Sequence, residues 1–117
     1  MTKSLKLLTG SILAAGMISA SPLQAAEPIE GTWKTESGET AGIGPCGGAF
    51  CITLKTGQYA GQRIGRMSGS GSSYSGTITD PSDGKEYSGS AKVNGGSLKL
   101  KGCALKIFCK TQNWTKL

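Results

Sequence analysis

The sequence of 117 residues contains no histidine. Histidine is the commonest general base in enzymes, and it is the usual activator of a serine or cysteine nucleophile. The chain also lacks the Gly-x-Ser-x-Gly sequence that presents a nucleophilic serine on a sharp turn. These absences argue against hydrolytic and acyl-transfer chemistry, and we predict that the protein is not an enzyme.

The chain also lacks an apolar run long enough to cross a bilayer as a helix. The longest run, Leu7 to Ala20, has about 14 residues, whereas a membrane-spanning helix needs about 20. It follows two lysines and precedes small residues, which is the pattern of a secretory signal peptide. We predict that residues 1–25 are this signal, with cleavage after Ala25 or, alternatively, Ala26, and that the protein is periplasmic or secreted. No cysteine lies near the cleavage point, so we expect no lipid anchor there.

Neither sign of charge forms a run. Without the predicted signal, 92 residues remain, with 11 basic and 7 acidic side chains and a net charge of +4. The basic residues are spread along the chain and form no stripe that follows a phosphate backbone. We therefore expect no nucleic-acid partner, and the length suits a single domain, residues 26–117.

Helix-favouring stretches are missing as well. Seventeen of the nineteen glycines follow the signal, and each glycine inside a helix costs about 1 kcal/mol relative to alanine. Short segments of alternating or β-branched residues instead recur between turn sequences. They span 31–36, 40–46, 50–55, 62–67, 74–79, 85–93, 97–101 and 109–115. We predict an all-β domain, either a small antiparallel meander or a closed β-barrel of about eight short strands, because closure removes exposed sheet edges.

Two connecting segments have distinctive compositions. Asp80 to Gly84 combines proline, aspartate and glycine at the positions of a turn. Ser68 to Ser73 consists of serine and glycine only, and we predict that it is a long flexible surface loop.

The four cysteines are Cys46, Cys51, Cys103 and Cys109, and in an oxidising compartment they are expected to form disulfides. Chain entropy favours long-range bridges. The Gly-Gly-Ala turn inside the first pair favours the local pairing, Cys46 with Cys51 and Cys103 with Cys109, which we prefer. The nested and crossed pairings stay open. The spacing fits neither a redox pair nor a zinc site.

Three carboxylates, Asp80, Asp83 and Glu86, lie within seven residues. Oxygen-rich loops can bind calcium, but this segment lacks the regular alternation of a calcium loop. We interpret these residues as turn-forming and expect neither a metal nor a cofactor.

Trp33 and Trp114 lie on the first and last predicted strands, which would be neighbours in a closed barrel. They either seal one end of the core or face a ligand cavity. About eight strands enclose just enough space for side chains or one small ligand. Because large apolar residues are few, we expect the interior to be filled.

Several segments resemble the small exported bacterial proteins of domain of unknown function 2147. They are Gly31-Thr32-Trp33, the Cys46 to Cys51 pair, Asp80 to Tyr87, Leu98 to Cys103 and Cys109 to Thr115. The resemblance covers almost all of the chain after the signal and implies an architecture without an activity. The Gly-x-Trp start and the last-strand tryptophan, Trp114, are also similar to lipocalin and avidin barrels, which is an analogy for fold and a weaker one for ligand binding.

The chain departs from that family in two places. The segment after Cys51 is short and lacks the usual Cys-Gly continuation and tryptophan-bearing stretch, and Tyr74 stands where the family tends to show tryptophan. If these positions form a binding surface, this chain has altered it. Tyr74 therefore joins Trp33 and Trp114 as a candidate ligand-binding residue.

The leading functional hypothesis is a non-catalytic envelope protein that binds a protein, a peptidoglycan fragment or a small molecule through its loops. One alternative is an inhibitor of lysozyme or of a secreted protease, with the Ser68 to Ser73 tract entering the enzyme's cleft. A second alternative is a carrier that holds a small apolar ligand between Trp33 and Trp114.

Overall fold

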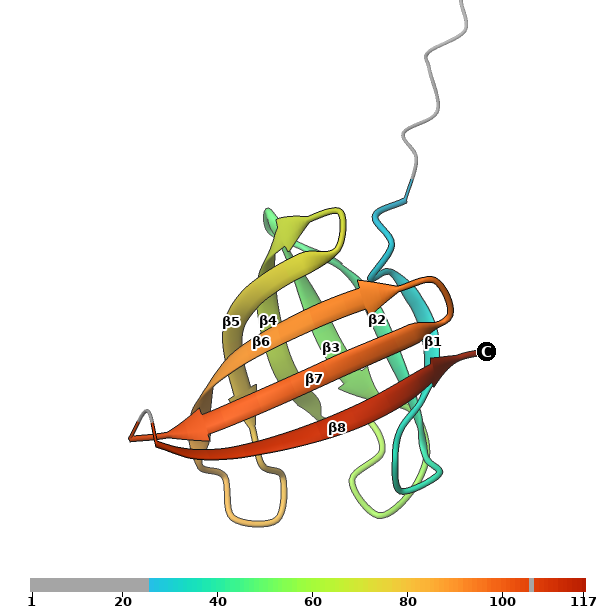
Figure 1. Ribbon diagram of the computed structural model, residues 1–117. Coiled ribbons are helices and arrows are strands. Elements are labelled where there is room, and N and C mark those ends of the chain that lie inside the picture. The colour runs from blue at the N-terminus through green and yellow to red at the C-terminus, as the bar shows by residue number, and fades with distance from the viewer. Residues whose placement is uncertain (1–25, 106) are drawn as a thin grey trace, which may run out of the picture.

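The computed structural model describes residues 26–105 and 107–117, so the predicted signal peptide lies outside the described residues. Eight strands follow one another along the chain (Figure 1). They are β1 (Gly31–Lys34), β2 (Thr40–Cys46), β3 (Ala49–Leu54), β4 (Arg63–Ser70), β5 (Ser73–Thr79), β6 (Glu86–Asn94), β7 (Ser97–Ala104) and β8 (Phe108–Lys116). No helix capable of crossing a membrane occurs in this part of the chain.

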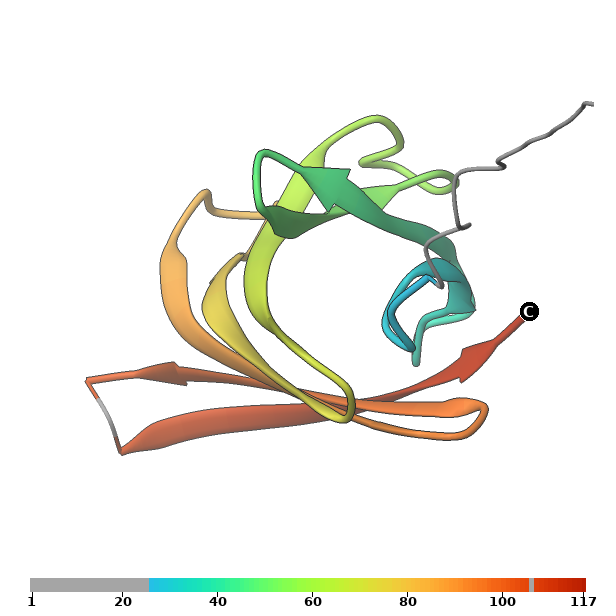
Figure 2. The same cartoon turned by 90° about the horizontal axis from the view of Figure 1, so that it is seen from above.

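Each strand pairs antiparallel with its neighbour in sequence, and the last strand returns to the first. Trp33 and Lys34 on β1 lie opposite Lys116 and Thr115 on β8, which closes the sheet into a barrel (Figures 1 and 2). The all-β prediction is confirmed, and of the two architectures considered the closed barrel of eight strands is the correct one.

The predicted loop over Ser68 to Ser73 is wrong. β4 and β5 continue through this tract with unbroken pairing, and only Gly71 and Ser72 turn the chain. A β-carbon at Gly69 would lie 2.8 Å from the Tyr74 Cα, so glycine here permits the close approach of two strands. Glycine content indicated flexibility, whereas the structure uses these glycines for pairing and for a tight turn.

The predicted turn at Asp80 to Gly84 is confirmed. The Gly84 amide donates to the Asp80 carbonyl at 2.7 Å, and Gly84 has a φ of 75°, which glycine adopts without strain. The Asp80 carboxylate accepts hydrogen bonds from the amide and the hydroxyl of Ser82, at 2.9 and 2.6 Å. These bonds hold the pKa of the Asp80 carboxyl below its usual value, with a smaller contribution from the positive charge of Lys110.

The two ends of the barrel differ. The turns β2–β3, β4–β5 and β6–β7 lie at the end where the N-terminal segment enters, which we call the sealed end (Figure 1). The remaining turns lie at the other end, which we call the open end. Segment 26–30 crosses the sealed end and inserts Ile29, which is fully buried, into the core. The core consists of Ile29, Trp33, Ala41, Ile43, Ile52, Leu54, Ile64, Met67, Tyr74, Ala91, Val93, Leu98, Leu100 and Trp114.

Polar contacts fix segment 26–30 in place. The Glu27 carboxylate accepts from the Gly71 amide at 2.8 Å and from the Tyr74 hydroxyl at 3.3 Å. The Lys116 ammonium donates to the Glu30 carbonyl at 2.9 Å and lies 5.1 Å from the centre of the Trp33 ring. The sealed end is therefore closed by apolar packing and by charged contacts from three parts of the chain.

We expect Tyr74 to make stability at the sealed end depend on alkaline pH. Burial raises the pKa of its phenol above the ordinary value of 10.0; the Glu27 charge adds to the shift, and a backbone hydrogen bond at Ile29 opposes it. As pH rises, the unfolded chain loses this proton first, so stability is intact below about pH 10 and is lost as pH climbs through the raised folded value. We expect Tyr74→Phe to flatten the decline of unfolding free energy with pH, measured by urea unfolding above neutral pH.

At neutral pH the same Tyr74→Phe variant should lose about 0.5–1.5 kcal/mol of stability, because the hydrogen bond to Glu27 is gone. A variant that declines as steeply as the wild type at alkaline pH would show that Tyr74 is not the titrating group.

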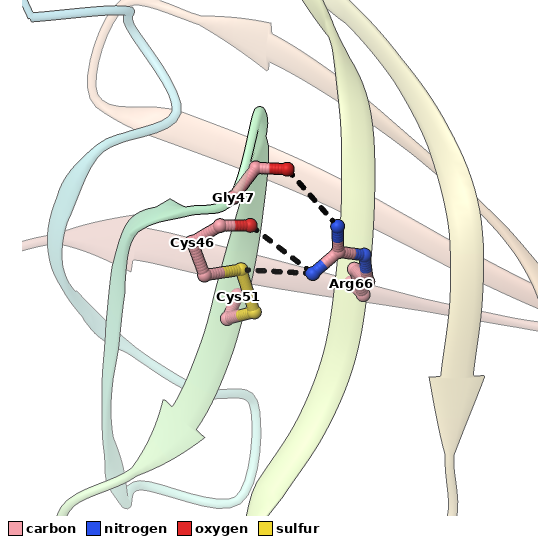
Figure 3. Close-up of a disulfide and its surroundings, with 4 residues drawn as sticks. All are labelled: Cys46, Gly47, Cys51 and Arg66. Atoms are coloured by element: carbon pink, nitrogen blue, oxygen red, sulfur yellow. Dashed lines mark hydrogen bonds between the residues drawn. A yellow bond between two sulfur atoms is a disulfide. The ribbon is translucent and has the colours of Figure 1, made fainter.

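Both disulfides are local: Cys46 is bonded to Cys51, and Cys103 to Cys109. The first spans the β2–β3 hairpin with its α-carbons 5.8 Å apart, and the second joins directly opposed residues of β7 and β8, 4.0 Å apart. Arg66 on β4 reaches across the first bridge and donates to the carbonyls of Cys46 and Gly47, at 3.1 and 3.2 Å (Figure 3). The β2–β3 turn is thus held by its disulfide and also by hydrogen bonds from Arg66 on β4.

Candidate functional site

The interior is filled toward the sealed end and hollow toward the open end. A cavity of about 670 Å³ opens between the β5–β6 turn and the β7–β8 hairpin. It is lined by Ile64, Ile78, Thr79, Asp80, Pro81, Tyr87, Leu100, Gly102, Ala104, Ile107, Phe108, Cys109, Lys110, Gln112 and Trp114. The expectation of a filled interior is therefore wrong for this half of the barrel.

Strand alternation determines which side chains of β8 face the cavity. Side chains along a strand point alternately to the two faces of the sheet. Trp114 is buried in the core, so Gln112, Lys110 and Phe108 share its face and follow one another toward the mouth. All four line the cavity. The wall therefore changes from a tryptophan at the deep end to an amide, an ammonium and an exposed phenyl ring at the mouth.

One inward position beside the cavity, Gly102, has no side chain to fill it. Glycines occupy inward positions on several strands, but other side chains fill the space in front of some of them. A β-carbon at Gly89 would meet the Ile78 and Met67 side chains at 2.7 and 2.8 Å. A β-carbon at Gly102 would meet nothing nearer than Tyr87, at 3.6 Å. The space in front of Gly102 is thus part of the hollow.

Few polar groups enter the cavity. The Trp114 indole N–H donates to the Gln112 side-chain oxygen at 2.9 Å, which satisfies the indole within the wall. Lys110 and Asp80 lie near the mouth, and the Asp80 carboxylate is already bonded to Ser82. The deep wall is therefore mainly apolar, and the mouth carries one cation and one carboxylate, Lys110 and Asp80.

The structure places the three candidate ligand-binding residues differently. Trp114 lines the cavity. Trp33 is 0% exposed, outside the cavity wall, and its indole N–H donates to the Ile29 carbonyl at 2.9 Å. Tyr74 is buried at the sealed end, with its ring edge-on to Phe50 at 5.7 Å between centroids. The pairing of β1 with β8 makes the two tryptophan-bearing strands neighbours, but only Trp114 faces the hollow.

The candidate carboxylates stay at the β5–β6 turn. Asp83 and Glu86 are exposed, and the Asp83 side chain accepts from the Lys85 amide at 2.8 Å. Asp80 is partly exposed at the cavity rim. The hydrogen bonds of the Asp80 and Asp83 carboxylates are those of turn-forming residues.

The sequence reasoning overlooked Lys110, Gln112 and the apolar residues Ile107 and Phe108. A signal was present: counting back from Trp114 in steps of two gives Gln112, Lys110 and Phe108 on one face. That face carries an amide and an ammonium where a core strand would carry apolar side chains. Polar residues on an inward face are expected where the barrel interior is not filled.

These features define a small, disulfide-bonded β-barrel protein with one filled end and one hollow end. The family model described as "Uncharacterized protein conserved in bacteria (DUF2147)" matches residues 52–116, more than half of the chain, and the chain belongs to this family. The matched region contains every residue that lines the cavity. No curated protein and no solved structure matches the chain.

Proposed function

We propose that this protein is an exported, non-catalytic binding protein that carries one small, largely apolar molecule in the open end of its barrel. The single observation that carries the proposal is the cavity of about 670 Å³ with Trp114 at its inner wall. Ligand pockets typically have volumes of about 300–1,000 Å³, apolar walls and a few polar groups that orient the ligand. The ligand then lies against Trp114, not between the two tryptophans.

One point supports a location outside the cytoplasm, and two support ligand binding. The two disulfides and the bacterial family fit a periplasmic or extracellular setting. The charged groups at the mouth, Lys110 and Asp80, are suited to orienting a polar end of the ligand. The aromatic and aliphatic wall supplies contact area that excludes water.

The inhibitor hypothesis loses the feature on which it depended. The Ser68 to Ser73 tract forms strand ends and a two-residue turn, and the Gly71 amide is bonded to Glu27. Inhibition of lysozyme or of a secreted protease stays a prediction that no feature of the barrel favours over ligand binding.

Filling the cavity tests the proposal. We expect the wild type to bind an apolar fluorescent probe such as an anilinonaphthalene sulfonate at one site, with displacement by a long-chain fatty acid. Gly102→Leu should weaken probe binding at least about tenfold, equivalent to about 1.4 kcal/mol, because its side chain occupies the hollow. Fluorescence titration measures both affinities.

Gly44→Leu is the matched control. Gly44 is also a strand glycine, and a β-carbon there meets nothing within 4 Å, but it does not line the cavity at the open end. This variant should bind the probe like the wild type. Equal binding by a folded Gly102→Leu protein, with folding checked by far-ultraviolet dichroism, would refute the proposed site.

A further inference from the structure

The tip of the β7–β8 hairpin carries apolar side chains that are largely exposed. Leu105, Ile107 and Phe108 are 82%, 74% and 65% exposed. We call these three residues the apolar tip. The β7–β8 hairpin projects past the barrel wall (Figures 1 and 2), and the apolar tip lies at its end, where β7 stops at Ala104 and β8 begins at Phe108. Apolar side chains gathered in this way mark an interaction site.

The fold holds the apolar tip outward. The Cys103–Cys109 bridge joins the two strands directly behind it, and Ala104 pairs with Phe108 one step further out. Leu105 has a φ of 53°, a left-handed conformation that is rare for residues other than glycine. The covalent bridge directly behind the turn holds Leu105 and Ile107 at the end of the hairpin, while Phe108 lies on the cavity face of β8.

The strands behind the apolar tip carry positive charge only. Lys99 and Lys101 lie on β7 and Lys110 on β8, and neither strand contains an acidic residue. By strand alternation Lys99 and Lys101 face outward, whereas Lys110 faces the cavity mouth. Lys99 also lies directly opposite Lys92 on β6. Like charges that face each other across a sheet repel, so the side of the sheet that carries Lys92, Lys99 and Lys101 has an excess of positive charge. Acidic groups border it at Glu86 on β6 and at Glu36, which accepts from the Asn113 amide.

We propose that the apolar tip inserts into the surface of an anionic phospholipid bilayer while the lysines behind it contact lipid phosphates. Apolar side chains next to a cationic surface are the combination that binds such interfaces, through burial of apolar area and attraction to anionic lipid. The pairing of apolar side chains with lysines on the same hairpin is the reason for choosing a bilayer as the occupant over a protein.

Docking in this way brings the cavity to the membrane, because Ile107 and Phe108 line the cavity mouth as well as forming the apolar tip. The inference goes beyond the proposed carrier function and does not require it. A protein that binds membranes with an empty cavity would still dock by this surface.

Vesicle sedimentation tests the proposal with the purified exported protein. We expect binding to vesicles of phosphatidylcholine mixed with phosphatidylglycerol, little binding to phosphatidylcholine alone, and weaker binding as salt is raised. The double variant Leu105→Asn, Ile107→Ser should bind at least about tenfold less tightly. Asparagine is chosen at position 105 because it tolerates the left-handed backbone. The double variant Lys99→Gln, Lys101→Gln should bind anionic vesicles at least about tenfold less tightly. It should also lose most of the preference for anionic over neutral lipid.

Two matched controls are available. Leu117→Ser removes an apolar side chain that is 64% exposed but lies at the C-terminus, far along β8 from the apolar tip, and it should bind vesicles like the wild type. Lys34→Gln removes one exposed charge from β1 and should have little effect.

Three results would overturn the proposal: no binding to anionic vesicles, unchanged binding by the apolar tip variant, or an equal loss in Leu117→Ser. Capture of an envelope protein through the apolar tip without vesicle binding would also overturn it. The Gly102→Leu variant separates the carrier proposal from the membrane proposal, because it should bind the fluorescent probe weakly and bind vesicles like the wild type. Loss of vesicle binding in that variant would contradict docking by the apolar tip.

Discussion

Replacing Trp33 with alanine is expected to lower the free energy of unfolding by about 3–5 kcal/mol. The indole is 0% exposed and donates to the Ile29 carbonyl, so the change leaves a void in the core and an unpaired buried carbonyl. A small domain has only about 5–15 kcal/mol of stability in total, so the variant should be close to unfolding. Urea denaturation followed by far-ultraviolet dichroism measures the effect.

The comparison with Trp114→Ala makes this prediction specific to the two ends of the barrel. Trp114 is 3% exposed but borders the cavity, and its indole N–H donates to the exposed Gln112 side chain. Alanine there opens space that is continuous with the cavity and leaves no buried carbonyl unpaired, so it should cost less than at Trp33. Thr32→Ala, an exposed neighbour on β1, should change stability little. Equal costs for the two tryptophans would contradict a filled sealed end and a hollow open end.

Removing both disulfides is expected to lower the free energy of unfolding by about 4 kcal/mol. Each bridge contributes about 2 kcal/mol, because each closes a loop of only about six or seven residues. The substitutions are Cys46→Ser with Cys51→Ser and Cys103→Ser with Cys109→Ser. The bridges lie on separate hairpins, so their effects should add. Urea unfolding of each double variant and of the quadruple variant gives the three values.

Dichroism at low denaturant should still show a β-sheet spectrum for each double variant, since the ladders on both sides of each bridge stay paired. Equal stability of the quadruple variant and the wild type would show that the bridges do not constrain the unfolded chain.

The sequence predicted the strands and the Asp80 to Gly84 turn because these depend on local chemistry. Alternating residues between turn sequences require neighbouring strands, and proline, aspartate and glycine fix a turn within five residues. Ser68 to Ser73 was misread because serine and glycine suit both a loop and a paired strand. The choice depends on how closely Tyr74 approaches Gly69, which is a contact between strands.

The cavity was harder to predict, because it depends on which inward glycines other side chains cover. Gly89 and Gly102 look alike in the sequence and face each other across β6 and β7. Ile78 and Met67 fill the space in front of Gly89, while the space in front of Gly102 stays open. Likewise, Trp33 and Trp114 have similar sequence surroundings, and only the packing of segment 26–30 over the sealed end separates their roles.

The two indole N–H groups allow one direct test of the central claim, that a ligand enters the open end and leaves the sealed end unchanged. Each gives its own signal in a ¹H–¹⁵N nuclear magnetic resonance spectrum, assigned with Trp33→Phe. On titration with a long-chain fatty acid, the Trp114 indole signal should shift to saturation with those of Leu100 and Gly102, while the Trp33 indole signal stays in place. A shift of Trp33 without Trp114, or no shift of either, would contradict the account.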